Sequence, residues 1–169
     1  MSANKNNALS VCLLYLLLLS GCDDNRQPMP SHDINLFNKL ITLDFPVEKV
    51  EWETFGTPEY TGGIPGPTDY VTLVAEVASG DTNAFMALPA LNEKIWIAPE
   101  AARPWLGREF HAFLNRNKNR TVDAATAPGC RNAKATLKKS ETPVTGLACQ
   151  GDNKILLYVT ISDSTGHQP

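Results

Sequence analysis

An apolar run near the N-terminus sets the first limit on what this chain can fold into. Residues 8–19 read ALSVCLLYLLLL, and the preceding residues carry Lys5 and no acidic side chain. A helix of this length spans about 18 Å, whereas the hydrocarbon core of a bilayer is roughly 30 Å thick. Asp23 and Asp24 follow where a stop-transfer helix has a basic flank. We therefore interpret the run as the core of a signal peptide rather than as a buried helix of the folded domain.

The apolar run ends in Leu19-Ser20-Gly21-Cys22, a leucine followed by two small residues and a cysteine. This pattern resembles the lipobox of bacterial lipoproteins, and the resemblance covers residues 1–22. It implies that Cys22 receives a diacylglycerol, becomes the first residue of the mature chain after cleavage, and carries an N-linked acyl chain such as palmitate. Several acyl chains give stable anchoring, because each buried CH2 group contributes about 0.8 kcal/mol.

Asp23 and Asp24 come directly after the cysteine. An aspartate in this place resembles the signal that retains enterobacterial lipoproteins in the inner membrane, and the second aspartate fits its stronger version. The resemblance implies a bacterial inner-membrane protein, anchored by lipid on the periplasmic face. The outer membrane is the alternative if this sorting rule does not apply. No later apolar stretch is long enough to span a bilayer, so we expect a soluble periplasmic domain.

The chain divides into a leader, one domain and two short flanking segments. We expect a cleaved signal peptide at 1–21, a proline-containing tether at 22–31, a globular domain at 32–163 and a flexible tail at 164–169. Hydrophobic residues make up 43% of the chain and charged residues 20%, which is typical of a folded domain. The net charge of −3 gives no general attraction to nucleic acid, so we expect no nucleic-acid partner.

Two cysteines are left for the mature domain. Cys12 leaves with the leader and Cys22 carries lipid, so Cys130 and Cys149 form an even pair in an oxidising compartment. A disulfide between them closes a loop of about 20 residues and contributes roughly 3 kcal/mol. A redox-active or metal-binding pair is the alternative, but the sequence has no CxxC spacing and no nearby histidine. Two free thiols are the other alternative.

Apolar periodicity predicts two main helices. Apolar residues recur on one helical face within 33–42, where Ser31 or Asp33 can form the N-cap and Pro46 ends the pattern. A second pattern covers PEAARPWLGREFHAFLNRN, from Pro99 onward.

Pro99 suits the first turn of that second helix. Pro104 and Gly107 are expected to kink the helix or divide it into two pieces. Arg116, Lys118 and Arg120 cluster at its end. There they complement the negative end of the helix dipole, which explains them without a ligand.

Alternating or β-branched segments predict the strands. We expect strands at 47–56, 69–77 and 154–163, and a hairpin from Cys130 to Gln150. The adjacent strands and tight turns favour antiparallel pairing. We therefore predict a single α+β domain, with an antiparallel sheet of about four to five strands, helices packed on one face and one disulfide.

Glutamates alternate with apolar residues in the first expected strand. Glu48, Glu51 and Glu53 interleave with Val50 and Trp52. Carboxylates that share a strand face occur in glycosidases, but they are more often solvated. We interpret this acidic face as solvent-exposed surface.

The segment 56–68, GTPEYTGGIPGPT, holds four glycines and three prolines in thirteen residues. It has no GK[ST] ending of a phosphate-binding loop. One interpretation is a plain hairpin loop. The other is a binding loop that displays Tyr60 and Ile64, since loops of this length are uncommon without a role.

No catalytic motif is evident, and His32, His111 and His167 show no metal-ligand spacing. We therefore predict no catalytic residue, metal or cofactor, and leave enzyme activity uncertain. The favoured function is contact with a protein partner, as an accessory of an envelope complex or as an immunity-type protein that neutralises a toxin. An envelope hydrolase and a small-ligand-binding lipoprotein are the alternatives.

Overall fold

The computed structural model describes residues 29–59 and 68–163. The first described residues already belong to the fold, because Ser31 and Trp52 exchange two backbone hydrogen bonds of 2.7 and 2.9 Å. The folded part therefore begins within the segment assigned to the tether.

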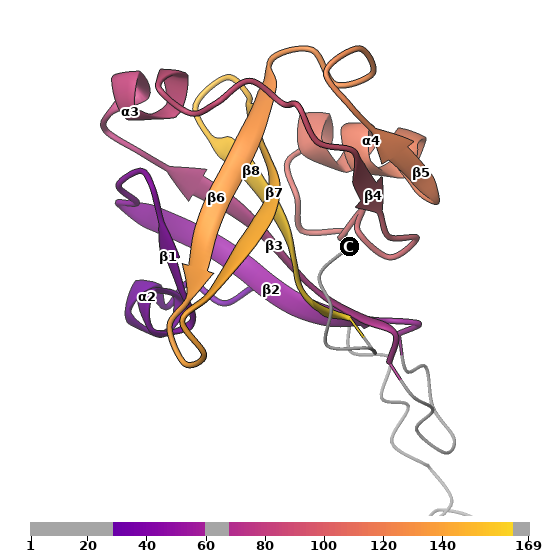
Figure 1. Cartoon of the computed structure of the whole chain (residues 1–169), viewed down its shortest axis with the longest axis horizontal. Coiled ribbons are helices and arrows are strands. Elements are labelled where there is room, and N and C mark those ends of the chain that lie inside the picture. The colour runs from indigo at the N-terminus through magenta and orange to yellow at the C-terminus, as the bar shows by residue number, and fades with distance from the viewer. Residues whose placement is uncertain (1–28, 60–67, 164–169) are drawn as a thin grey trace, which may run out of the picture.

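Most of the molecule is a curled antiparallel sheet of six strands in the order β1-β6-β7-β8-β3-β2 (Figure 1). Two further strands form a separate antiparallel pair, β4 with β5. The strands are β1 (Ile41–Leu43), β2 (Lys49–Thr57), β3 (Tyr70–Ala78), β4 (Ile95–Ile97), β5 (Arg120–Val122), β6 (Cys130–Leu137), β7 (Thr142–Gln150) and β8 (Ile155–Asp163). The helices are α2 (Ile34–Leu40), α3 (Thr82–Met86) and α4 (Arg108–Asn117).

Strands β3 and β8 are neighbours in the interior of the sheet, and both of their faces are buried. Six consecutive residues of β3, from Thr72 to Val77, are buried, as are the first five residues of β8. Such continuous burial is typical of strands covered on both faces. On β7, Gly146 allows β8 to approach closely, since a Cβ atom there would lie 2.1 Å from the Tyr158 carbonyl oxygen.

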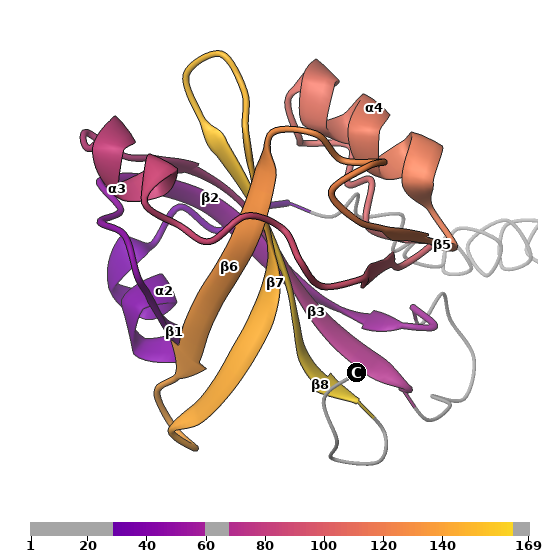
Figure 2. The same ribbon diagram turned by 45° about the horizontal axis from the view of Figure 1, so that its top comes forward.

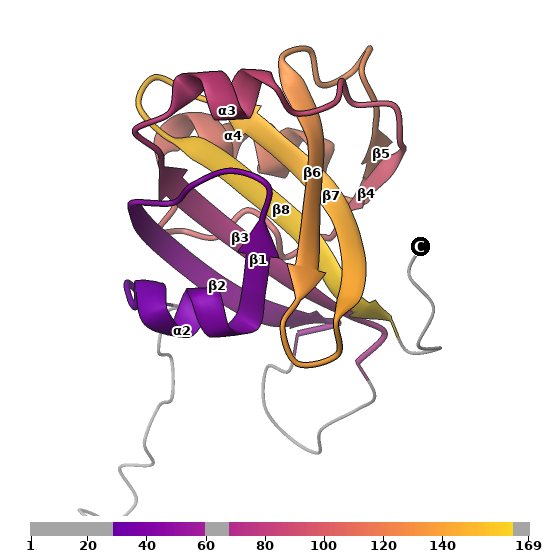
Figure 3. The same ribbon diagram turned by 60° about the vertical axis from the view of Figure 1, so that its left-hand side comes forward.

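One core fills the concave face of the curled sheet. Helix α2 runs beside β2 and continues directly into β1, so it closes the open side of the curl (Figure 3). Its Phe37 is fully buried and meets Trp52 of β2 edge to face, with ring centroids 5.8 Å apart. Phe85 of α3 joins the same apolar cluster.

A second core lies on the outer face of the sheet. Helix α4 and the β4–β5 pair cover this face, on the other side of β3 and β8 from α2 (Figure 2). Phe110 and Leu114 of α4 pack with Val74 and Tyr158 of the sheet. The antiparallel sheet and the disulfide are confirmed. The prediction of four to five strands was too low. The prediction that helices pack on one face only was wrong, because both faces of β3 and β8 are buried and each face needs a cover.

The helix boundaries differ from the expectation at two places. The helix expected at 33–42 ends at Leu40, because Ile41–Leu43 pairs with β6 as strand β1. Asp33 caps α2, with its Oδ1 accepting a hydrogen bond of 2.9 Å from the Leu36 backbone N–H. The expectation that Pro99 begins a helix was wrong, because residues 98–107 form a series of turns and α4 begins only at Arg108. Pro104 lacks an N–H group and disfavours helical backbone at the residue before it.

Candidate functional site

Several residues expected to be functional lie outside the described part of the chain. These are Cys22, Asp23 and Asp24 of the leader region, and Tyr60 and Ile64 of the candidate binding loop. Their roles remain predictions. Within the residues that the structure describes, no helix is both long and apolar enough to cross a bilayer.

Cys130 and Cys149 form the expected disulfide. They lie directly opposite each other in the β6–β7 ladder, with their Cα atoms 4.1 Å apart. The bond therefore ties together the ends of the hairpin that the sequence predicted.

The most polar buried feature of the outer face is an arginine held by two glutamates, which we call the Arg103 clamp. Arg103 is only 3% exposed and lies in the turns before α4. Its Nη2 and Nε atoms donate to the two carboxylate oxygens of Glu53 on β2, over 2.5 and 3.0 Å. Its Nη1 and Nη2 atoms donate to the two oxygens of Glu59, each over 2.8 Å. Both carboxylates are thus bound in the bidentate geometry that favours arginine over lysine.

The surroundings of the clamp fix the protonation state of Arg103. The guanidinium lies over the Phe55 ring, 4.9 Å from its centroid, and Trp105 Nε1 donates a 2.8 Å hydrogen bond to Glu53. Burial lowers the pKa of Arg103, but the hydrogen bonds and charges of Glu59 and Glu53 outweigh it, so the pKa is raised. The arginine is therefore charged at every pH at which the protein is folded.

The clamp fixes the base of the connection between β2 and β3. Glu59 is the last described residue before residues 60–67. Next to it, Thr57 Oγ1 donates to Glu100 over 3.0 Å, and the Asp69 N–H donates to the Thr57 carbonyl over 2.8 Å. The chain therefore leaves and re-enters the sheet here through a base bonded to the turns before α4.

A second acidic group lies one strand away on the same face. Glu76 of β3 is 2% exposed, accepts a hydrogen bond from the Gly107 N–H, and pairs with Lys154 Nζ over 2.6 Å. Lys154 also pairs with Glu51 over 3.1 Å, and Glu51 faces Glu76 directly in the β2–β3 register. The hydrogen bond to Glu76 is the main cause of the raised pKa of Lys154.

These contacts correct the interpretation of the acidic strand face. The side chain of Glu53 is only 16% exposed, and it is covered by Arg103 and Trp105 rather than by solvent. Arg103 and Lys154, which are far along the chain, pair with the glutamates of this face. These ion pairs offset the cost of burying the carboxylates. All four oxygens of Glu53 and Glu59 already accept hydrogen bonds from Arg103, so this pair serves to hold structure.

The histidines contribute little to these clusters. His32 Nδ1 lies 3.8 Å from Glu51 with its side chain 69% exposed, and His111 is half-buried on α4. His167 lies outside the described residues. Among residues 29–59 and 68–163, no group of three or more His, Cys, Asp or Glu side chains is placed to hold a metal ion.

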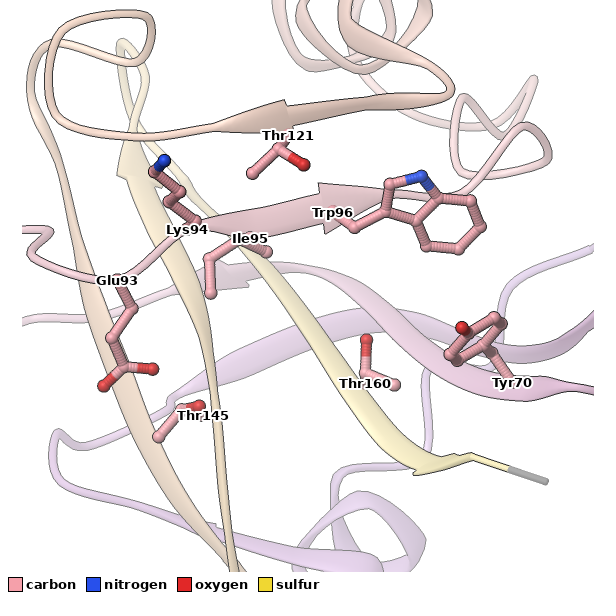
Figure 4. A pocket seen from close by; sticks show the side chains of 8 residues that line it. All are labelled: Tyr70, Glu93, Lys94, Ile95, Trp96, Thr121, Thr145 and Thr160. Carbon is pink, nitrogen blue, oxygen red and sulfur yellow. The ribbon is translucent and has the colours of Figure 1, made fainter. Parts of the chain in front are cut away.

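A cavity of about 260 Å³ lies on the outer face, between β4 and the sheet (Figure 4). Thr145 and Thr160 of the sheet form its floor, and Tyr70 and Trp96 stand at one end. Residues of β4, β5 and the segment before β4 complete its lining. They are Glu93, Lys94, Ile95 and Thr121.

Tyr158 fixes the height of β4 above the sheet. Its hydroxyl accepts a 2.8 Å hydrogen bond from the backbone N–H of Ala98, the residue directly after β4. Burial raises the pKa of Tyr158 to about 12, although the hydrogen bond from Ala98 partly offsets this effect. The tyrosine therefore stays neutral, and its hydroxyl ties the end of β4 to β8.

Sequence reasoning missed the clamp and the cavity. Arg103 lies 50 and 44 residues from its two partners, and local periodicity carries no signal over that separation. The available signal was indirect, since three acidic residues on a strand next to apolar positions require a basic partner if that face is covered.

Comparison with known proteins adds no relative on which to base a function. No protein-family model, no curated protein and no solved structure matches this chain.

Proposed function

We propose that this chain is a bacterial lipoprotein, anchored through Cys22 on the periplasmic side of the inner membrane, whose folded domain acts by contact with another protein. The Leu19-Ser20-Gly21-Cys22 pattern supports the anchor. The disulfide between Cys130 and Cys149 supports an oxidising compartment outside the cytoplasm.

The Arg103 clamp is the observation that carries the contact function. Burying a charged group is costly, and a buried ion pair contributes more to a defined local geometry than to stability. Here that geometry fixes Glu59 at the base of residues 60–67, a segment rich in glycine and proline. A rigid base at Glu59 lowers the entropic cost of binding a partner beside it.

The same clamp argues against Glu53 and Glu59 as the catalytic carboxylates of a hydrolase. A carboxylate that acts as general acid or base must exchange a proton with substrate, so it has to be free in the resting enzyme. Glu53 and Glu59 instead accept four hydrogen bonds from one permanently charged arginine. The partner we favour is a periplasmic protein, either a component of an envelope complex or a toxin that this chain neutralises.

Deletion of residues 61–66 tests the contact function. The deletion leaves Glu59 and the clamp intact, so the domain is expected to keep its unfolding midpoint. In crosslinked native membranes, we expect at least one protein captured by the intact chain to be lost with the deletion. The matched control replaces Asp152 and Asn153 by serine. These residues lie in the β7–β8 turn, which the strand register places at the opposite end of the sheet from residues 61–66. This variant is expected still to capture that protein. Capture that survives the deletion would exclude a role for residues 61–66.

The anchor and its sorting are tested separately. Mass spectrometry of the chain from native membranes is expected to find an acylated Cys22 at the mature N-terminus. Replacing Asp23 and Asp24 by serine is expected to move the chain from the inner-membrane to the outer-membrane fraction of a density gradient. An intact Met1 terminus, or a Cys22 without lipid, contradicts the lipoprotein assignment. An unchanged membrane fraction contradicts only the sorting role of the aspartates.

A further inference from the structure

We propose that the cavity between β4 and the sheet binds one neutral pyranose ring of a saccharide. This site is distinct from residues 61–66, and its existence does not depend on the contact function. The volume of about 260 Å³ lies just below the range of about 300–1,000 Å³ that holds drug-sized ligands. It therefore fits a ligand of one ring better than an extended chain.

The floor of the cavity is a row of hydroxyl groups. Thr145 of β7 and Thr160 of β8 both line the cavity from the outer face, where the β7–β8 ladder ends at Gly146 and Val159. Thr72 of β3 continues the row, because it faces Thr160 directly. Paired strands lie about 5 Å apart, so Thr72 and Thr160 are close neighbours, and each threonine hydroxyl can both donate and accept a hydrogen bond.

The row of hydroxyls suits the edge of a sugar ring. A pyranose carries several hydroxyl groups around its rim, and each needs a partner when water is removed from it. Thr145 and Thr160 are half-buried and line the cavity, whereas Thr72 is buried beneath the cover. Figure 4 shows the Thr160 hydroxyl pointing up toward β4, into the space that a ligand would occupy.

One end of the cavity is aromatic. The rings of Tyr70 and Trp96 lie 5.2 Å apart between centroids and are tilted by 44°. Both are half-buried, and each combines an apolar ring with a polar atom. Figure 4 shows the Tyr70 hydroxyl on the side of its ring that faces the cavity. The axial C–H groups of a pyranose form an apolar face, and an aromatic ring covers such a face while the ring hydroxyls stay exposed to the threonines.

The charges at the opposite end favour a neutral ligand. Glu93 and Lys94 lie there, away from Trp96 and Tyr70 (Figure 4). One negative and one positive side chain give no net charge that would select an anion or a cation. Both are solvent-exposed, and an exposed charge contributes little binding energy. Their polar atoms are available to the hydroxyl groups at the rim of a sugar.

The cavity is held open before any ligand binds. The Tyr158 hydroxyl bonds to Ala98 and sets the distance between β4 and the sheet. Tyr158 and Thr160 lie on the same face of β8, two residues apart, so one strand supplies both the support and the floor. A site that is formed in advance loses less entropy on binding.

The experiment titrates the full-length chain, purified in detergent and labelled with fluorotryptophan. The chain has three tryptophans, and the Trp96→Phe variant assigns the fluorine resonance of Trp96. The probes are methyl glucoside, methyl galactoside and N-acetylglucosamine, each to about 10 mM, which is tenfold above a dissociation constant of 1 mM. Acetyl-leucine amide is the probe for a peptide side chain. We expect at least one sugar to shift the Trp96 resonance, with saturation, and the leucine amide to leave it unchanged.

Two threonine variants show whether the hydroxyl row is responsible. Thr160→Val keeps the shape of the side chain and removes its hydroxyl, so we expect it to weaken sugar binding about tenfold. The matched control is Thr136→Val on β6, whose side chain is exposed on the same face but does not line the cavity, and we expect no change. Thermal unfolding of both variants verifies that each is folded.

Three results would overturn the proposal. The first is a Trp96 resonance that no sugar shifts in the folded wild-type chain. The second is a sugar affinity that Thr160→Val and Thr136→Val leave equally unchanged. The third is a shift caused by acetyl-leucine amide alone, which would assign the cavity to a peptide side chain instead. The deletion of residues 61–66 tests only the contact with a protein partner, and its result does not change any of these outcomes. The contact function and the sugar site can therefore be disproved independently.

Discussion

The two faces of the curled sheet are covered in different ways. On the concave face, α2 brings Phe37 against Trp52, Leu73 and other apolar side chains, and the cover is short and continuous in sequence with β1. On the outer face, the cover is the segment from β4 through α4 to β5, and it meets the sheet through the Arg103 clamp, Glu76 and Tyr158 as well as through apolar contacts.

This difference suggests a division of roles, in which the concave core mainly stabilises the fold and the polar contacts of the outer face position its cover. Apolar packing is non-directional, so it stabilises the concave core without fixing one particular contact. Bidentate ion pairs and a buried tyrosine hydroxyl are directional, so they fix where the outer cover lies on the sheet. Both candidate sites, the base of residues 60–67 and the cavity under β4, belong to the directional face.

The largest stability effect is expected in the concave core. Phe37→Ala removes a fully buried ring and should lower the free energy of unfolding by about 4 kcal/mol. The control is Leu36→Ala on the same helix, which is 50% exposed and should change stability by less than about 0.5 kcal/mol. Urea unfolding measures both. A Phe37→Ala variant within about 1 kcal/mol of wild type would show that packing on this face does not dominate stability.

The next effect is expected in the Arg103 clamp. Arg103→Met leaves Glu53 partly buried without its main partner and should cost about 3 kcal/mol. Adding Glu53→Gln should recover part of this loss, because the uncompensated charge is then gone. Hydrogen exchange should show residues 98–107 opening in Arg103→Met while β3 stays protected.

Arg116→Met is the control for the clamp, since Arg116 is exposed near the end of α4. It is expected to change stability by a few tenths of a kcal/mol at most. Equal protection of residues 98–107 and β3 in Arg103→Met would break the distinction between the two faces.

The Tyr158 hydroxyl gives the outer face a dependence on alkaline pH. Its pKa is raised from 10.0 to about 12, so the unfolded chain loses this proton first as the pH rises. The resulting stability is complete below about pH 10 and is lost progressively toward pH 12. The shift corresponds to about 2–3 kcal/mol.

Tyr158→Phe removes this titration together with the bond to Ala98. At pH 7 the variant should be about 1 kcal/mol less stable than wild type. The difference between the two should shrink and then reverse as the pH approaches 12, because only the wild type has a buried phenol to ionise. Urea unfolding from pH 7 to 12 measures it. Parallel curves over this range would contradict the assigned role of Tyr158.

The smallest effect is expected at the cap of α2. Asp33→Ala removes the acceptor of the Leu36 N–H and should cost about 1 kcal/mol, whereas Asp33→Asn should retain most of the stability. Packing of Phe37 holds the helix in either case, so the concave face should stay closed by hydrogen exchange. A larger loss in Asp33→Ala than in Phe37→Ala would mean that the helix, rather than its packing, limits this face.

Local sequence patterns were sufficient for β2, β3, β8, the β6–β7 hairpin and the disulfide, but they did not predict the short strands β1, β4 and β5. The apolar runs 69–77 and 154–163 became the neighbouring strands β3 and β8, and the hairpin ending in Cys130 and Cys149 formed with those residues opposite each other. These features depend on residues close in sequence or on a simple period, which a single sequence displays directly. The wrong prediction of a helix from Pro99 also has a local cause. The apolar spacing favoured a helix, whereas Pro104 prevents one before Arg108.

The sequence by itself determined the leader pattern, the central strands and the pairing of the last two cysteines. Only the tertiary structure decided that the outer face is covered, that Arg103 joins Glu53 to Glu59, and that Tyr158 holds β4 over a row of threonines. The physical reason is range. Periodicity records which side of an element is apolar, but the partner of a buried charge or hydroxyl is chosen by how elements separated by 44 to 60 residues come to lie against each other.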